Sequence, residues 1–173
     1  DFDQLQQVDI GVYPAAQVLC DKSDPQSVAD AKFSLQYCVA TALLEGRVGL
    51  QEFSSQALAN ERTRELMKRV SVSIDPESQA AYPHCWSAVL TTHVEGRGPL
   101  VTRLSNPKGD PENRLQQGEM ERKFATLVEY GAGEETATVL VPQLLDWIKG
   151  LQGDQLVTVG PLAELGSSPD LIQ

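Results

Sequence analysis

Hydrophobic residues near the start of the chain alternate with polar or small ones. Val8, Ile10 and Val12 stand two residues apart, a period that predicts a half-buried β-strand. Pro14 follows closely, and because proline has no N–H to give to a sheet, it ends this strand or restricts it to a sheet edge. The stretch DKSDPQSVAD, residues 21–30, is rich in turn-forming residues and predicts a loop.

From about Ala29 the apolar residues change to three- and four-residue spacing, which predicts an amphipathic helix ending at Gly46. Two shorter helices are predicted next, in LQEFSSQAL (residues 50–58) and in NERTRELMKRV (residues 60–70). Asn60 is the expected N-cap of the second, because its side chain can accept hydrogen bonds from the first free N–H groups of a helix.

Strand patterns return after these helices. VSVSI, residues 70–74, alternates cleanly, and a loop is predicted for DPESQAAYP, residues 75–83. CWSAVLTTHV and LVTRL, joined by EGRG, predict a β-hairpin. One strand, then helices, then three strands predict an α+β fold with a mostly antiparallel sheet packed against helices.

The last third of the chain reads as helical after a long polar connection, SNPKGDPENRLQQGE, residues 105–119. Helices are predicted in MERKFATLVEY and in ETATVLVPQLLDWIKGL, with Pro142 expected to kink the second. The tail from residue 153 is expected to fray. The two helices carry more apolar surface than they can bury on each other, so we expect another helical body to cover them.

Composition excludes several classes of function. A net charge of -10 argues against nucleic-acid binding, since no basic surface could neutralise several phosphates. No apolar run approaches the roughly 20 residues that span a bilayer, so no membrane contact is expected. The start has neither a signal-peptide pattern nor a Met, and we expect the chain to begin inside a longer protein. Cys20, Cys38 and Cys85 form no CxxC pattern, which predicts reduced cytoplasmic thiols and no metal site.

Familiar catalytic signatures are missing from the sequence: it contains no GxSxG, HExxH, P-loop or GxGxxG ahead of a helix. His84 and His93 are nine residues apart, a poor spacing for metal ligands. His93, next to a predicted turn, is most simply a surface residue.

The start of the long predicted helix is the first candidate site. A helix N-terminus offers free N–H groups to an anion, and Lys32, Ser34, Gln36 and Tyr37 could add a charge and directional donors there. The spacing by itself favours a plainer interpretation, in which Ser34 only caps the helix, Lys32 is solvated and Tyr37 belongs to the core.

The second candidate is AAYPHCW, residues 80–86. Tyr82 and His84 would lie in a loop that enters a strand, where functional groups are often displayed, and a Tyr–His pair can transfer protons. The alternative is that both are partly exposed packing residues. NPKGDPEN, residues 106–113, has the Gly and Lys of an anion-binding loop, but its two carboxylates indicate a structural loop instead.

An ordered set of segments resembles the C-terminal part of the MmgE/PrpD family, which includes 2-methylcitrate dehydratase, cis-aconitate decarboxylase and iminodisuccinate epimerase. The segments are DAKFSLQYCVATALLEGRVGLQEF, RVSVSID, AYP, PKGDPEN and the KF of MERKFATL, and the resemblance covers roughly residues 8–150. It implies a small α+β lid domain in residues 1–112. It also implies that residues 113–173 are a helical segment that packs on a large helical domain not contained in this sequence.

The resemblance further implies an active site between lid and helical domain, where a small di- or tricarboxylate loses a proton next to a carboxylate, without a cofactor. Lys32 and Tyr82 are then the expected catalytic residues. Substrate contacts are expected from Ser34, Gln36, Tyr37 and His84. A hydro-lyase in a homodimeric enzyme is the first expectation. An epimerase with the same residues, and a lid-like binding module that catalyses nothing, remain as alternatives.

Overall fold

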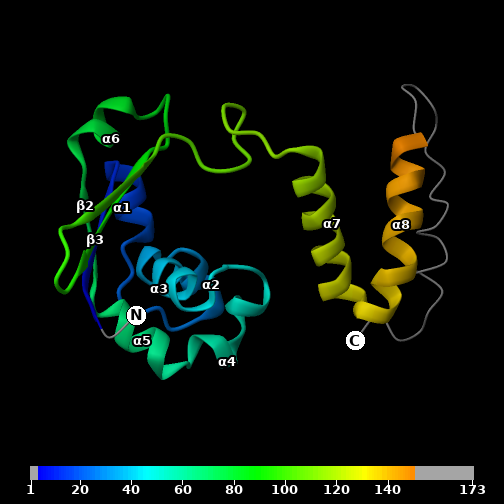
Figure 1. Cartoon of the computed structure of the whole chain (residues 1–173), viewed down its shortest axis with the longest axis horizontal. Helices are drawn as coiled ribbons and strands as arrows, with labels where there is room; N and C mark the ends of the chain where they lie inside the picture. Colours follow the sequence, from blue (N-terminus) through cyan, green and yellow to red (C-terminus); the bar gives the residue numbers. More distant parts are fainter. Residues whose placement is uncertain (1–3, 151–173) are drawn as a thin grey trace. The chain divides into compact units, whose positions relative to one another are not determined.

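The computed structural model describes residues 4–150, which divide into two compact units. The first ends at Asn113 and the second begins at Arg114. The first unit holds a sheet covered by short helices, and the second holds a pair of long helices (Figure 1).

The sheet of the first unit has four strands in the order β2-β1-β3-β4. They are β1 (Leu5–Val12), β2 (Val70–Ile74), β3 (Ala88–Val94) and β4 (Leu100–Leu104). β1 and β2 are parallel, whereas β1–β3 and β3–β4 are antiparallel. The predicted α+β fold with a mostly antiparallel sheet is therefore confirmed, including the hairpin formed by β3 and β4.

Alternation along β1 sorts its side chains between the two faces of the sheet. Val8, Ile10 and Val12 are at most 3% exposed and belong to the hydrophobic core, together with Tyr37 and Leu66 from the helices. Helices α1 to α5 lie on this side of the sheet in Figure 1. β1 is an inner strand, so Pro14 ends it rather than marking an edge.

The single helix predicted from about Ala29 is in fact two helices, and the prediction was wrong at this point. α2 (Val28–Lys32) stops before Phe33, and α3 (Leu35–Glu45) begins after Ser34. The interruption occurs because the Ser34 side chain accepts a hydrogen bond from the N–H of Tyr37 and so starts a new helix. α3 ends, as predicted, at Gly46, whose φ of 70° suits glycine best.

Two short helices occupy stretches where none was predicted. α1 (Pro14–Cys20) follows β1 directly, and α6 (Pro76–Ala81) replaces the loop expected after β2. Both begin with proline, which is favoured in the first turn because its missing N–H would have no helical partner there. Asp75 caps α6 by accepting hydrogen bonds from the N–H and the hydroxyl of Ser78, both at 2.8 Å.

The two short helices predicted between Leu50 and Val70 are found in the structure, the first of them in two pieces. A 3₁₀ turn η2 (Gln51–Phe53) and α4 (Ser55–Leu58) occupy the first predicted short helix, and α5 (Glu61–Met67) the second. Asn60 caps α5 by accepting hydrogen bonds from Arg62 and Thr63.

The second unit is a hairpin of α7 (Gln117–Ala132) and α8 (Glu134–Gly150), joined at Gly133. Lys149 near the end of α8 forms an ion pair of 2.9 Å with Glu121 near the start of α7, so the helices are antiparallel. Only Ala137 and Leu144 of these two helices are buried. The predicted fraying tail lies outside the described residues. Within residues 4–150, no helix combines the length and apolarity needed to cross a membrane.

Candidate functional site

The start of α3 is built around the side chain of Ser34. Its hydroxyl oxygen accepts a hydrogen bond from the N–H of Tyr37 at 3.0 Å, and the hydroxyl donates to the carbonyl oxygen of Lys22 at 2.6 Å. With 1% of its surface exposed, Ser34 ties the loop after α1 to the first turn of α3. It thereby fixes where the N-terminal end of this helix lies.

Gln36 and Tyr37 are also bound inside the protein. The amide nitrogen of Gln36 donates to the carboxylate of Asp21 at 2.5 Å, and the Tyr37 hydroxyl donates to the backbone carbonyl of Glu52. Both residues are at most 2% exposed. Burial raises the pKa of the Tyr37 phenol, so this group keeps its proton at neutral pH.

A polar cavity of about 200 Å³ lies beside Tyr37, between α3 and the start of α5. Its walls include the side chains of Thr41, Glu45 and Asn60. The Thr41 hydroxyl is buried and has no hydrogen-bond partner among the described residues. Space for water next to an unpaired hydroxyl explains how that group can be satisfied.

Lys32 and Phe33 are the exposed residues of this junction. Lys32 ends α2, and its side chain makes no ion pair within the described part of the chain. Phe33 is 55% exposed, and the Lys22 ammonium group lies 5.9 Å from the centre of its ring. Lys22 also binds Asp30 at 2.9 Å. An anion that approaches this surface therefore meets one unpaired cation next to a capped helix start.

Tyr82 and His84 lie in the loop between α6 and β3, and the Tyr82–Pro83 peptide bond is cis. The ring of Tyr82 stacks on Tyr13, with 4.5 Å between centroids and 9° between planes. Trp86 packs against the same Tyr13, with 6.1 Å between the ring centroids. Tyr82 is 39% exposed and His84 is also exposed, so both can be reached from outside.

An ion pair holds α6 and its loop against the sheet. Arg103 of β4 binds the Asp75 carboxylate through two nitrogens, at 2.9 and 3.3 Å. Together with the N–H of Ser78, this contact holds the pKa of Asp75 well below its usual range. Because Asp75 starts α6, the same contacts determine where the loop with Tyr82 leaves the helix.

The sequence-predicted residues therefore form two groups. Lys32, Ser34, Gln36 and Tyr37 lie together at the α2–α3 junction, and Tyr82 and His84 lie beyond α6. No hydrogen bond, ion pair or ring contact described for residues 4–150 joins the two groups. α6 and the α2–α3 junction also stand well apart in Figure 1.

One polar network was missed by reasoning from the sequence. On the side of the sheet away from the core, His93 contacts Asp9 at 2.8 Å, and Asp9 accepts a hydrogen bond from Ser71 at 2.6 Å. The Ser71 bond, opposed by partial burial, lowers the pKa of Asp9. Polar residues at every second position of β1 were the available signal, but their partners come from β2 and β3.

The next feature is the distribution of side chains that could bind a metal ion. Residues 4–150 contain no cluster of three or more His, Cys, Asp or Glu side chains that could hold a metal ion. The three cysteines are free and half-buried, and burial raises the pKa of the Cys20 and Cys38 thiols.

Comparisons with known proteins agree with the segments identified in the sequence. The family model of the MmgE/PrpD C-terminal domain matches residues 1–145. Cis-aconitate decarboxylase of the mouse, Mus musculus, is 26% identical over 100 residues, which make up 58% of this chain and 20% of that protein. The match thus spans about a fifth of the relative's length.

Proposed function

The chain belongs to the MmgE/PrpD family, and on this premise we propose that it is the lid part of a cofactor-independent lyase. Its substrate is a small di- or tricarboxylic acid that loses a proton next to a carboxylate. The observation that carries the proposal is the exposed, unpaired Lys32 beside the capped start of α3, in a protein whose net charge is -10.

Lys32 has the role of binding a substrate carboxylate and stabilising the negative charge that develops after proton loss. A cation can do this best where few other charges compete, and the positive end of the α3 dipole adds to the effect. Ser34, Gln36 and Tyr37 are buried and bound internally. This supports a positioning role for these three residues, in which they hold the helix start that faces the substrate.

Tyr82 is proposed as a proton donor or hydrogen-bond donor to the same substrate, with His84 as a neighbouring polar contact. Their exposure supports this, as does the fixed ring orientation that Tyr13 gives to Tyr82. Because the Lys32 and Tyr82 groups do not touch each other in this unit, the substrate would have to bridge them or one group would act alone.

The reaction requires more than this chain in our proposal. Other acid–base groups and the exclusion of water come from a helical domain of the same family, in a homodimeric enzyme. We therefore expect this chain to bind polycarboxylates weakly and to catalyse little by itself. The similarity to cis-aconitate decarboxylase supports the substrate class, since that protein's name identifies a tricarboxylate.

The two alternatives, an epimerase and a non-catalytic binding module, are distinguished from a hydro-lyase by following the substrates with proton NMR in D₂O. An epimerase would exchange the proton next to the carboxylate with solvent without losing water or CO₂, whereas a hydro-lyase would release water. Proton NMR in D₂O on 2-methylcitrate, citrate, cis-aconitate and iminodisuccinate separates these reactions. A non-catalytic binding module would leave all four compounds unchanged even with its helical partner present.

The lid role is tested by titrating the ¹⁵N-labelled chain with citrate and cis-aconitate and following amide shifts by NMR. We expect shifts centred on residues 32–37, which Lys32→Gln removes. Lys123→Gln is the matched control, because Lys123 is an exposed lysine of α7 and the change in net charge is the same. Equal shifts in wild type and Lys32→Gln would rule out the proposed role of Lys32.

A further inference from the structure

The polar cavity of about 200 Å³ beside Tyr37 contains a buried hydroxyl that no described residue satisfies. Thr41, which carries this hydroxyl, is 3% exposed and lines the cavity. A buried polar group without a partner costs free energy, so it marks a place where a bound molecule stabilises the protein. The cavity has the volume of about six water molecules at ~30 Å³ each, which restricts its occupant to a small molecule.

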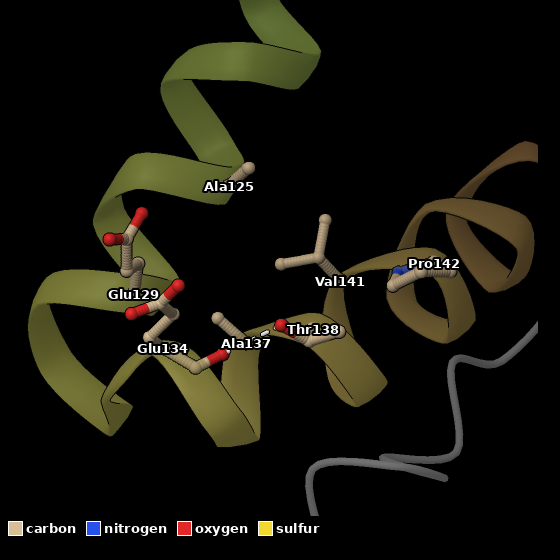
Figure 2. A pocket seen from close by; sticks show the side chains of 7 residues that line it. All are labelled: Ala125, Glu129, Glu134, Ala137, Thr138, Val141 and Pro142. Carbon is tan, nitrogen blue, oxygen red and sulfur yellow. Dashed lines mark hydrogen bonds between the residues drawn. The ribbon is translucent and has the colours of Figure 1, made fainter.

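The recess of the helical hairpin lacks such a group (Figure 2). It is larger, at about 360 Å³, but its polar lining residues, Glu129, Glu134 and Thr138, are all exposed. Exposed polar groups are satisfied by bulk water and do not select an occupant. The cavity beside Tyr37 is therefore the stronger candidate for a binding site.

Three oxygen-bearing side chains line this cavity in one row on α3. Tyr37, Thr41 and Glu45 are four residues apart, so they lie on the same face of the helix, one turn after another. Burial raises the pKa of the Tyr37 phenol, and the Thr41 hydroxyl partly offsets this rise, so the two oxygens lie near each other. The Tyr37 proton is directed at the carbonyl of Glu52 instead. The phenol oxygen can therefore still accept a hydrogen bond, as can the Thr41 hydroxyl and the Glu45 carboxylate.

One negative charge of the cavity wall has no counter-charge among the described residues. Glu52 is 8% exposed, and its carboxylate accepts hydrogen bonds from Nε of Arg47 at 3.1 Å and from the N–H of Gly49 at 2.7 Å. Arg47 thus balances Glu52 without lining the cavity. Glu45 makes no ion pair in the described part of the chain. An occupant with a single positive charge would balance the wall.

We propose that this cavity binds a small primary amine in its protonated form. An ammonium group has one positive charge and three N–H donors without an acceptor, which matches the row of three acceptors on α3. The two carboxylates disfavour an anion, and a divalent metal ion would leave one positive charge unbalanced. The inference does not depend on the lyase proposal, because neither Lys32 nor Tyr82 lines this cavity.

The test uses the ¹⁵N-labelled 173-residue chain and three chloride salts at constant ionic strength. Methylammonium is the probe. Tetramethylammonium carries the same charge without N–H donors, and potassium carries it as a bare ion. We expect methylammonium to shift the amides of Thr41, Glu45 and Asn60 in a saturable way, and the other two salts to leave them unchanged.

A variant at Thr41 separates binding from folding. Thr41→Val removes the hydroxyl and should stay folded, because no hydrogen bond within residues 4–150 is lost. It should bind methylammonium about tenfold more weakly, as the loss of a hydrogen bond to a charged group predicts. Thr41→Ser keeps the hydroxyl and should bind like wild type. Circular dichroism and thermal unfolding check that both variants are folded.

The charge of Glu45 is tested in the same way. Glu45→Gln should also weaken binding about tenfold, whereas Glu95→Gln, at an exposed acid just after β3, removes an equal charge and should not. No saturable shift with methylammonium overturns the proposal, as does unchanged binding in Thr41→Val. Equal shifts with potassium overturn it in favour of a metal ion, and equal shifts with tetramethylammonium show that only charge is recognised, which also overturns it.

Discussion

Residues 4–113 enclose a hydrophobic core between a sheet and its helices, whereas the helices of residues 117–150 bury only two residues, although both units expose large apolar side chains. In the first unit, Val8, Ile10 and Tyr37 are at most 3% exposed. In the second, only Ala137 and Leu144 are buried, and Val139 is 62% exposed. The first unit therefore has a core that can stabilise it by itself, whereas the second has little buried apolar surface and offers its helices to another protein body.

The same difference separates the roles in our account. The first unit has polar side chains that are fixed by internal hydrogen bonds, as at Ser34, and can therefore hold Lys32 in a defined place. The second unit has acidic and apolar side chains without partners in the described residues, as at Glu129 and Glu134. A lid needs both properties: a rigid surface that faces the substrate and an attachment to the rest of an enzyme.

The largest effect is expected from the core of the first unit. Ile10→Ala should lower the free energy of unfolding by about 2–5 kcal/mol, because the removed atoms leave a cavity in a fully packed site. Urea unfolding followed by the fluorescence of Trp86, in a Trp147→Phe background, measures this unit alone. A loss under about 1 kcal/mol would mean that the core is loosely packed and the contrast between the units is wrong.

A smaller loss is expected at the ion pair that anchors α6. Asp75→Ala removes the N-cap of α6 and both contacts from Arg103, and should cost about 1–3 kcal/mol. Glu77→Gln is the control, since Glu77 makes a single contact with Arg103, at 3.3 Å, and its side chain is 77% exposed. If the two variants unfold at the same urea concentration, the anchor contributes nothing specific.

The same carboxylate predicts a pH dependence. Arg103 and Ser78 hold the pKa of Asp75 below its value in the unfolded chain. The ionised carboxylate therefore stabilises the folded protein fully above about pH 4, and this stabilisation is lost as the pH falls further. The loss should be clearly smaller in Asp75→Asn, whose amide does not titrate. Identical acid unfolding curves for wild type and Asp75→Asn would contradict this assignment.

The next largest loss of stability is expected from a substitution at the start of α3. Ser34→Ala removes a helix cap and a buried donor to the carbonyl of Lys22, with an expected loss of about 0.5–2 kcal/mol. Ser54→Ala, which removes the cap of the four-residue α4, should cost less. Thermal unfolding of both variants measures the difference. A larger loss for Ser54→Ala would show that Ser34 does not determine the position of α3.

The smallest effect is expected on the surface of the hairpin. Val139→Ser should change the stability of the isolated chain by no more than about 0.5 kcal/mol, because the side chain is already exposed. Heat denaturation followed by circular dichroism measures this. A loss comparable to that of Ile10→Ala would mean that Val139 is buried in solution, and the hairpin would not offer a free surface.

Much of this fold could be predicted from periodicity. The alternation in β1 and β2, the EGRG turn and the caps at Gly46 and Asn60 depend on neighbours in sequence, so they are visible there. α1 and α6 were missed because each is too short to show a helical period. One unbroken helix was predicted from about Ala29 because apolar spacing continues across Ser34, although the plainer interpretation already had Ser34 as a cap. The hydrogen bond from the Tyr37 N–H shows that Ser34 starts a new helix.

The candidate site was less accessible to sequence reasoning. Its residue types pointed to the α2–α3 junction and to the loop with Tyr82, but not to which side chains are free. Ser34, Gln36 and Tyr37 are bound to Lys22, Asp21 and Glu52, partners 12 to 15 residues away that no local pattern reveals. The stacking of Tyr82 on Tyr13 likewise joins two segments that the fold, rather than the local sequence, brings together.

Amide hydrogen exchange of the full chain, resolved by residue, tests the contrast between the units most directly. Our account predicts that the amides of β1 and β3 exchange only through global unfolding of the first unit. Those of α7 and α8 should exchange far faster, because few apolar contacts hold these helices. Protection of α7 and α8 equal to that of β1 would contradict the account, since the hairpin would then be complete without a partner.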